Sequence, residues 1–357
     1  MLYRLAGIRH VSYAADRQLW KLPLDRFLVG AVLVFALAAP VILPSLYLDS
    51  YLLPVVVWAT ASLGLNLLMG WAGQIHLGYA AVMAIGAYGS IHLARAGLPF
   101  ELAVLSGGLV SAAIGIVFGG AALRVKGLYL AITTLAMQFI VEFVIAHTPA
   151  ISGGTQATLQ APRFALLGLP VTDGRGRYYV ALLVCAIVTS FMLNIGRTSF
   201  GRALMTIRDK DFAAEVIGVD TFRFKLLAFW TSSFIGGVAG AVIAFCYYGA
   251  VTPEQFNLDV SISAVAMVIV GGMGSVLGSF FGTALVLLAP IVLNNLVAWL
   301  ARAASLGLSQ EAISHIPLVL YGALIIGFLM AEPLGLAKIY DNFRNYLLVW
   351  PFRHARR

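Results

Sequence analysis

Polar side chains are few in the long apolar runs, and five of them, within or at the ends of these runs, are candidates for chemistry inside a membrane: Asn66, Gln74, His76, Gln138 and Glu142. Gln138 and Glu142 are one helical turn apart and would share a helix face. Polar groups at membrane depth mark substrate pathways, proton relays or bonds between helices. A relay needs several acidic groups, and only Glu142 is a carboxyl well within a run. We therefore treat the five as candidates for lining or gating a pathway, and we disfavour proton-coupled transport.

Three of these residues also have a structural interpretation. Asn66 and Gln74 could hydrogen-bond across helices, which contributes about 0.6 kcal/mol per bond on average. A lone histidine such as His76 is more often a hydrogen-bonded residue at a helix end than a ligand. The sequence alone leaves both interpretations open.

Catalytic motifs are absent from the sequence. It contains no P-loop, no HExxH, no GxSxG and no paired carboxylates within an apolar run. Cys185 and Cys246 both lie in apolar runs, so neither a disulfide framework nor a metal site is expected. An intramembrane enzyme is therefore disfavoured. Energy for transport must come from an ion gradient or from another subunit, and the lack of an acidic relay favours the second.

The composition indicates an all-α polytopic membrane protein. Of 357 residues, 61% are hydrophobic and 11% are charged, whereas a soluble domain has about 25% charged residues. About ten spans are expected, which places both termini on one side of the membrane. The runs lie at 27–48, 51–69, 76–94, 100–122, 127–147, 178–195, 222–248, 260–275, 279–299 and 315–331. The runs 27–48 and 51–69 are almost contiguous, and the run 260–275 is short. These three runs could therefore include half-helices or re-entrant elements.

The positions of the basic residues predict the orientation. In this topology, 18 of the 23 Lys and Arg residues fall on the side of the termini, so both termini are expected in the cytoplasm. We predict a cytoplasmic tail at 1–26 without a cleavable signal, a permease domain at 27–331, and a basic tail at 332–357. The net charge of +8 follows from this placement beside membrane lipids and does not indicate nucleic-acid binding.

Two glycine clusters predict broken helices beside a pathway. Most of the 36 glycines can be explained by close packing of helices in lipid. The stretches 70–78 and 271–282 are denser than packing requires. The expected break positions are Gly70, Gly73, Gly78, Gly271, Gly272 and Gly274.

The longest charged segment between two apolar spans lies at 196–221. We predict one or two short amphipathic helices, with Asp209 or Asp211 as a cap, Glu215 facing solvent and Gly218 as the C-terminal stop. A small-residue face of Ala203, Ala213 and Ala214 favours docking into a partner. An ordinary basic loop is the alternative.

Two segments are expected on the outer side. The loop at 148–177 is rich in turn residues and flexible at its ends, and it could receive a soluble partner or serve as a solvated connector. The segment at 250–261 predicts a short surface helix that begins near Pro253.

Five segments, in order, resemble the longer permease type of branched-chain amino acid ABC importers. They are GLNLLMGWAGQIHLGYAAVMAIGAY (64–88), LRVKGLYLAITTLA (123–136), SFGRALMTIRDKDFAAEVIGVDTFRFKLLAF (199–229), GGVAGAVIA (236–244) and VIVGGMGSVLGSFFG (268–282). The resemblance implies a type II-like importer permease in the bacterial inner membrane. The implied partners are a second, unlike permease, two ATP-binding subunits that hold ATP and Mg, and a periplasmic binding protein.

The resemblance also assigns roles to residues. The central segment is implied to be the coupling helix that docks into an ATP-binding subunit, with Arg202, Arg208, Asp209, Ala213, Ala214, Glu215 and Gly218 at the matching positions. In the outer loop Ser152, Gly153 and Gly154 fit the family motif, whereas Gln156 and Ala157 replace an acidic or amide residue and a glycine. This departure leaves the substrate open between branched-chain or other hydrophobic amino acids, urea or short amides, and small organic acids. A stand-alone channel or secondary transporter is the alternative from another class.

Overall fold

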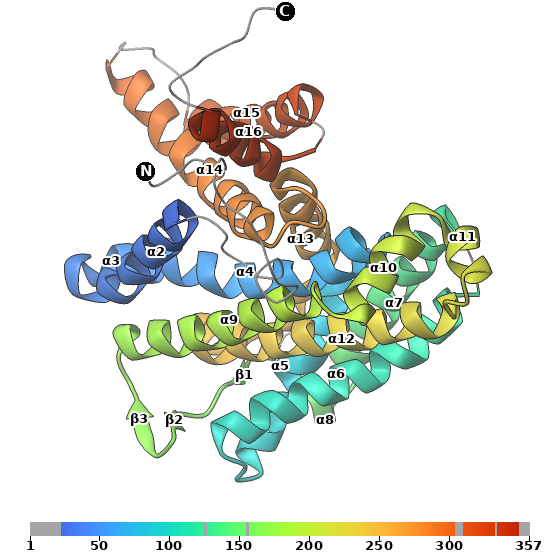
Figure 1. The fold of residues 1–357 in the computed structure, drawn as a ribbon. Coiled ribbons are helices and arrows are strands. Elements are labelled where there is room, and N and C mark those ends of the chain that lie inside the picture. Colours follow the sequence, from blue (N-terminus) through green and yellow to red (C-terminus); the bar gives the residue numbers. More distant parts are fainter. Residues whose placement is uncertain (1–22, 125–126, 155–156, 304–309, 333, 350–357) are drawn as a thin grey trace, which may run out of the picture.

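The computed structural model describes residues 23–124, 127–154, 157–303, 310–332 and 334–349. The described chain is almost entirely helical (Figure 1). Apolar segments become helices because a helix satisfies all of its own backbone hydrogen bonds in lipid. The elements before the basic segment are α2 (Pro23–Ile42), α3 (Ser45–Tyr47), η1 (Leu48–Leu52), α4 (Leu53–Asn66), η2 (Leu67–Trp71), α5 (Tyr79–Arg95), α6 (Phe100–Ala122), α7 (Leu128–His147), α8 (Pro149–Ser152), β1 (Leu159–Gln160), β2 (Phe164–Leu166), β3 (Leu169–Val171) and α9 (Gly174–Ile195).

The basic segment forms two helices, and the remaining elements follow it. They are α10 (Ser199–Asp209), α11 (Asp211–Val216), α12 (Thr221–Val242), η3 (Ile243–Tyr248), β4 (Ala250–Val251), η4 (Pro253–Phe256), α13 (Leu258–Gly271), α14 (Val276–Ala303), α15 (Gln310–Ala331) and α16 (Leu336–Val349). The 3-10 helix η4 begins at Pro253, as expected, but both Pro253 and Phe256 are buried rather than on the surface.

Seven helical units in the described residues are long and apolar enough to cross a membrane. They are Ser45–Trp71, Phe100–Ala122, Tyr129–His147, Gly174–Ile195, Thr221–Tyr248, Pro253–Gly271 and Val276–Leu300. The other three expected spans correspond to α2, α5 and α15, which form helices but do not meet this criterion. The all-α membrane fold is thus confirmed, and the number of ten spans stays a prediction.

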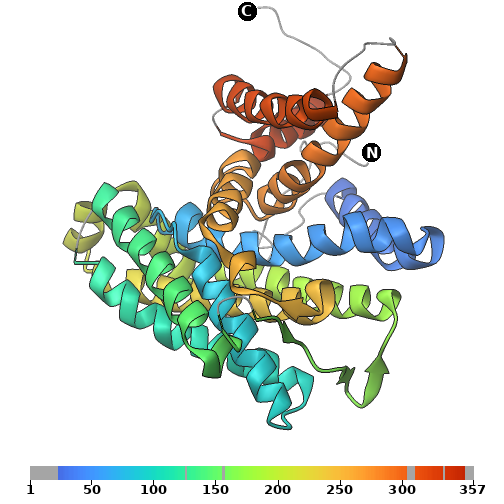
Figure 2. The same cartoon turned by 180° about the vertical axis from the view of Figure 1, so that it is seen from behind.

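Helices α4, α9 and α12 lie side by side, with α10 and α11 at one end and α3 at the other (Figures 1 and 2). Helices α14 to α16 stand to one side of this group. Two hydrogen bonds join α2 to α9, from the hydroxyls of Tyr178 and Tyr179 to the carbonyls of Ala36 and Leu37. The sequence predicted the segment after 332 as a tail, but residues 336–349 form a helix that packs beside α14.

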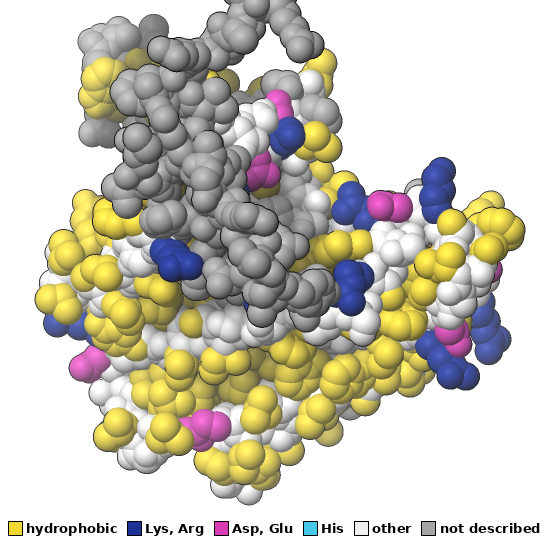
Figure 3. Space-filling view, viewed as in Figure 1, with side chains coloured by type: hydrophobic (Ala, Val, Ile, Leu, Met, Phe, Trp, Pro, Cys, Tyr) yellow, Lys and Arg dark blue, Asp and Glu magenta, His cyan; other side chains and the backbone are white. Residues whose placement is uncertain are grey.

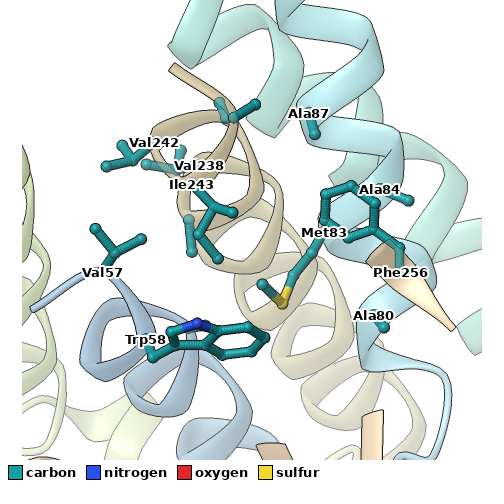
Figure 4. Close-up of a cluster of buried hydrophobic side chains, with 14 of the residues drawn as sticks. Val57, Trp58, Ala80, Met83, Ala84, Ala87, Val238, Val242, Ile243 and Phe256 are labelled. Carbon is teal, nitrogen blue, oxygen red and sulfur yellow. The ribbon is translucent and has the colours of Figure 1, made fainter. Parts of the chain in front are cut away.

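The core forms around α5, whose side chains are buried from Tyr79 to Tyr88. Figure 4 shows Met83 of α5 pointing toward Trp58 of α4, on the side where Val238 and Val242 of α12 lie, whereas Ala84 lies beside Phe256. Helices α5 and α12 touch through their backbones, since a Cβ atom at Gly86 would lie 2.1 Å from the carbonyl oxygen of Gly237. Close glycine contacts of this kind are typical of helix association in lipid.

The outer loop is more ordered than its turn-rich sequence suggests. Strand β1 pairs with β4 in antiparallel register, and β2 pairs with β3 as a hairpin. Arg95 donates a hydrogen bond of 2.8 Å to the carbonyl of Gln160, which fixes β1 to the end of α5. The loop ends at Asp173, because the following helix starts at Gly174, four residues earlier than the apolar run indicated.

Candidate functional site

The two glycine-rich breaks lie against each other, joined by Asn66. The Asn66 amide nitrogen donates to the carbonyl of Ser275 at 2.8 Å and to the hydroxyl of Ser279 at 2.9 Å. Its Oδ1 accepts a bond of 2.7 Å from the backbone N–H of Gly274. These bonds satisfy backbone groups that a broken helix leaves unpaired, which is the condition for irregular backbone at membrane depth. Asn66 therefore ties the end of α4 to the turn between α13 and α14.

The contact between the breaks requires glycine at Gly70. A Cβ atom there would lie 2.0 Å from Asn66 Oδ1 and 2.3 Å from the nitrogen of Gly274. Gly274 has a φ of 89°, a conformation that side chains other than glycine rarely adopt. The indole N–H of Trp71 donates to the carbonyl of Gly274 at 2.9 Å. Gly70 and Gly271 were predicted as break positions but lie within η2 and α13, so the breaks begin only after Trp71 and at Gly272. The two breaks nevertheless meet in one junction.

Arg208 connects this junction to the basic segment. Its guanidinium Nη1 donates a hydrogen bond to the carbonyl oxygen of Gly70 at 2.5 Å. A Cβ atom at Gly73 would lie 3.1 Å from Arg208 Cγ, so the arginine stem also covers the second glycine of the break. Displacement of α10 would therefore act directly on the point where α4 meets the turn between α13 and α14.

The boundaries of α10 and α11 differ in part from the predicted caps. Thr198 caps α10 by accepting from the N–H of Gly201, and Lys210 precedes α11 without a side-chain cap. Asp209 ends α10 and Asp211 begins α11, so neither caps the second helix as expected. Asp211 instead pairs with Lys225 at 2.7 Å, since α12 returns beside α11.

The small residues of the segment do not form one exposed face. Ala203 and Ala214 are buried against the chain itself, whereas Ala213 is exposed. Three large apolar residues of α11 and its C-terminal end are exposed to solvent: Phe212, Val216 and Ile217, which are 79%, 71% and 71% exposed. We name these three residues the α11 patch. The sequence analysis did not single out Phe212 or Val216, although two large apolar residues between charged ones were a signal for such a surface.

Three further predicted residues of the segment, Gly218, Glu215 and Arg202, lie at or near the ends of α10 and α11. Gly218 has a φ of 87° and ends α11, and the N–H of Val219 bonds to the carbonyl of Ala214. The Glu215 carboxylate accepts from the hydroxyl of Thr221 at 2.8 Å and remains exposed, as expected. Arg202 is exposed and donates to the carbonyl of Arg197. Lys and Arg side chains gather at this end of the molecule, whereas its flank is largely apolar (Figure 3).

The break before α5 is lined by polar groups that bond to its backbone. His76 is buried, and its Nδ1 accepts from the N–H of Gly78 at 3.0 Å, so the proton of the neutral ring is on Nε2. The N–H of Leu77 donates to the hydroxyl of Thr134 at 3.0 Å. The side chain of Gln74 is also buried, and its Oε1 has no hydrogen-bond partner among the described residues. His76 thus occupies the helix-end position that its structural interpretation predicts.

Gln138 hydrogen-bonds to a backbone N–H in the first turn of α5. Its Oε1 accepts from the N–H of Ala81 at 2.8 Å and from the Ser261 hydroxyl at 3.0 Å. Its Nε2 donates to the carbonyl of Phe256 at 2.7 Å. The side chain is fully buried and holds α5, α7 and η4 together. This geometry gives Gln138 a structural role, and its role in a pathway stays a prediction.

Replacing Gln138 with alanine is expected to lower the stability of the protein. The change leaves the N–H of Ala81 and the carbonyl of Phe256 buried without partners, at a cost of about 1–3 kcal/mol for each group. Thermal denaturation in detergent, followed by size-exclusion chromatography, measures the change. Thr133→Ala on the same helix is the control, because the half-buried Thr133 donates its hydroxyl hydrogen bond within α7, to the carbonyl of Tyr129. Altered substrate preference at unchanged stability would instead assign Gln138 to the pathway.

Glu142 lies one turn further along α7, beside a narrow crevice. The crevice is lined by Ala81, Ala84, Tyr88, Glu142, Ile145, Pro253 and Phe256. Glu142 Oε2 and the Tyr88 hydroxyl are both buried there without hydrogen-bond partners among the described residues. Gln138 and Glu142 thus share a face of α7. Gln138 hydrogen-bonds to the N-terminal end of α5, whereas Glu142 faces the crevice.

The outer loop begins with a tight turn. Gly153 and Gly154 have φ values of 87° and 126°, and the Ser152 hydroxyl bonds to the backbone of Gly154 at 3.1 Å. His92 of α5 bonds to the carbonyl of Ile151 at 2.7 Å, which anchors the turn. Gln156 lies outside the described residues.

Comparison with known proteins places this fold in a family. Residues 47–333 match the family described as branched-chain amino acid transport system / permease component. The chain is 33% identical over 276 residues to the high-affinity branched-chain amino acid transport system permease protein LivM of Salmonella typhimurium. It is also 33% identical over 299 residues to the protein of the same name from Escherichia coli. No solved structure matches the chain.

These alignments cover most of this chain but less of the relatives. They span 70% of the chain and 64% of the Salmonella protein, and 77% of the chain and 69% of the Escherichia protein. A probable permease protein LivH from Methanocaldococcus jannaschii is 30% identical over 158 residues, which is 43% of this chain and 48% of that protein. The family match extends across nine of the ten expected spans, from α3 to the end of α15. The chain therefore belongs to the family of branched-chain amino acid transport system permease components and is a multi-pass protein of the inner membrane.

Proposed function

We propose that this chain is a permease subunit of an ATP-driven importer and forms half of the pathway for branched-chain or other hydrophobic amino acids. The observation that carries the proposal is the bond from Arg208 of α10 to Gly70 in the junction of the two breaks. It links a segment with an exposed apolar surface to the irregular backbone of the membrane domain. A movement imposed on α10 and α11 can thereby change the packing of α4 against α13 and α14.

The partners follow from this architecture. The α11 patch would dock on an ATP-binding subunit, which holds ATP and Mg and hydrolyses the nucleotide. A second, unlike permease would form the other half of the pathway, which agrees with the similarity to proteins named LivM and LivH. A periplasmic binding protein would deliver the amino acid to the opposite face, where β2 and β3 form the outer hairpin.

The test is reconstitution of the complex in nanodiscs. This chain is co-expressed with its candidate partner subunits, and ATP hydrolysis is measured with and without a binding protein loaded with leucine. Stimulation by the loaded protein is the expected result. A complex that forms but ignores leucine would exclude this substrate class and favour urea or another small solute. A chain that forms no complex and moves solute alone in liposomes would establish a stand-alone transporter.

A further inference from the structure

A pocket of about 370 Å³ lies at the ends of α4, α9 and α12 that are opposite to α10 and α11. Asp49, Ser50 and Leu53 contribute from η1 and the start of α4, Arg177 from the first turns of α9, and Tyr247 from η3. Its volume is at the small end of the range for ligand pockets in proteins, which corresponds to a ligand of few atoms. By the orientation of the basic residues, this end faces away from the cytoplasm.

The pocket contains one acidic and one basic side chain that do not pair. Asp49 Oδ1 and Arg177 Nε are both buried, and neither has a hydrogen-bond partner among the described residues. Both residues are half-buried and line the pocket, and an unpaired charge in such a site is costly, so a ligand of opposite charge would be stabilised beside each of them. Asp49 also lies against the start of α9, since a Cβ atom at Gly174 would be 2.8 Å from its Oδ1. The positive end of a helix dipole stabilises a carboxylate at this position.

We propose that this pocket binds the zwitterionic head of a free amino acid at the outer entrance of the permease. Asp49 accepts hydrogen bonds from the α-ammonium group, and the Arg177 guanidinium donates to the α-carboxylate. Leu53 and Tyr247 provide the apolar contact for the side chain. The inference rests on the proposed function and deepens it by naming the atoms that recognise the substrate.

The charge pattern of the pocket selects among substrate classes. A zwitterion neutralises both side chains at once. Urea and other uncharged amides would leave both charges uncompensated, and a simple organic acid would leave Asp49 uncompensated. Opposite charges held apart in one pocket therefore favour an amino acid over the other small solutes.

The experiment measures equilibrium binding of labelled L-leucine to the assembled transporter in nanodiscs, without the binding protein. Asp49→Asn and Arg177→Gln are each expected to weaken leucine binding by about tenfold or more. Arg175→Gln, at an exposed position of the same helix as Arg177 that does not line the pocket, serves as the matched control, with an expected change of less than about twofold. Leucine binding that is equal in the wild type and both charge variants would overturn the proposal.

Two leucine analogues separate the roles of the two charges. Leucinamide lacks the carboxylate, so its binding should be insensitive to Arg177→Gln and still weakened by Asp49→Asn. 4-Methylpentanoate lacks the ammonium group and should show the reverse pattern. Retained leucinamide binding by Arg177→Gln also shows that this variant is folded. Equal sensitivity of both analogues to both variants would contradict the assignment of the two charges.

The experiments distinguish an incorrect assignment of the pocket from an incorrect assignment of the importer function. A wild-type complex that takes up leucine at the expense of ATP, with unchanged binding and uptake in both variants, would retain the importer and exclude this pocket. A wild-type complex whose ATP hydrolysis and uptake ignore leucine would refute the proposed function itself.

Discussion

Gly70→Val is expected to abolish ATP-driven uptake and to remove most of the folded protein from the membrane. Valine would place its Cβ 2.0 Å from Asn66 Oδ1 and 2.3 Å from the nitrogen of Gly274. Neither atom can move freely, because a hydrogen bond of 2.7 Å joins them. Overpacking of a well-packed site costs about 1–3 kcal/mol, and the loss of this buried bond adds to it. The junction between the two breaks would therefore come apart.

Membrane abundance and thermal stability in detergent measure this effect. Gly30→Val on α2 is the matched control, because nothing lies within 4 Å of a Cβ atom at Gly30. The control should retain wild-type abundance and stability. A Gly70→Val protein with normal stability and normal uptake would show that the junction is not required for either.

Phe212→Asp is expected to reduce ATP-driven uptake by about tenfold or more while leaving the protein folded in the membrane. Phe212 is 79% exposed and takes no part in the core, so its replacement costs the free chain little. At an interface, a buried carboxylate facing apolar groups would cost several kcal/mol, and aromatic residues commonly contribute most to binding. The loss should therefore appear in the association with the ATP-binding subunit.

Co-purification with the ATP-binding subunits measures this association directly. Leu167→Asp is the control, since Leu167 is 86% exposed on the hairpin of β2 and β3 at the far end of the molecule. It should retain the ATP-binding subunits in full. Equal recovery of these subunits with Phe212→Asp would rule out the α11 patch as the docking surface.

The sequence by itself determined the class of the protein and the position of its helices. Long apolar runs permit little besides helices in a membrane, because lipid offers no hydrogen-bond partners for the backbone. Nine of the ten runs coincide with helices whose ends shift by a few residues, and the run 27–48 is divided at Leu43 and Pro44 into α2 and α3. The sequence also predicted the helical break at Gly272 and Gly274, since turns with positive φ favour glycine. Gly218 ends α11 for the same reason.

Only the tertiary structure decided which polar groups meet. Asn66 and Gly274 are separated by 208 residues along the chain, and nothing local in either segment specifies that they bond. The same holds for Gln138, whose spacing from Glu142 predicted a shared face but not its bonds to Ala81 and Phe256. Hydrogen bonds of this kind depend on how the helices pack, and periodicity along one helix carries no information on its neighbours.

In the basic segment, too, some features could be predicted from the sequence and others depended on the tertiary structure. Its charges and its terminal glycine were evident from the sequence, whereas the caps and the exposed face were not. Asp211 pairs with Lys225 because α12 returns beside α11, and this contact withdraws the carboxylate from the helix end. Ala203 and Ala214 turn inward for the same reason, which leaves Phe212 on the surface. Likewise, only the packing of α4, α9 and α12 brings Asp49 and Arg177 into one pocket.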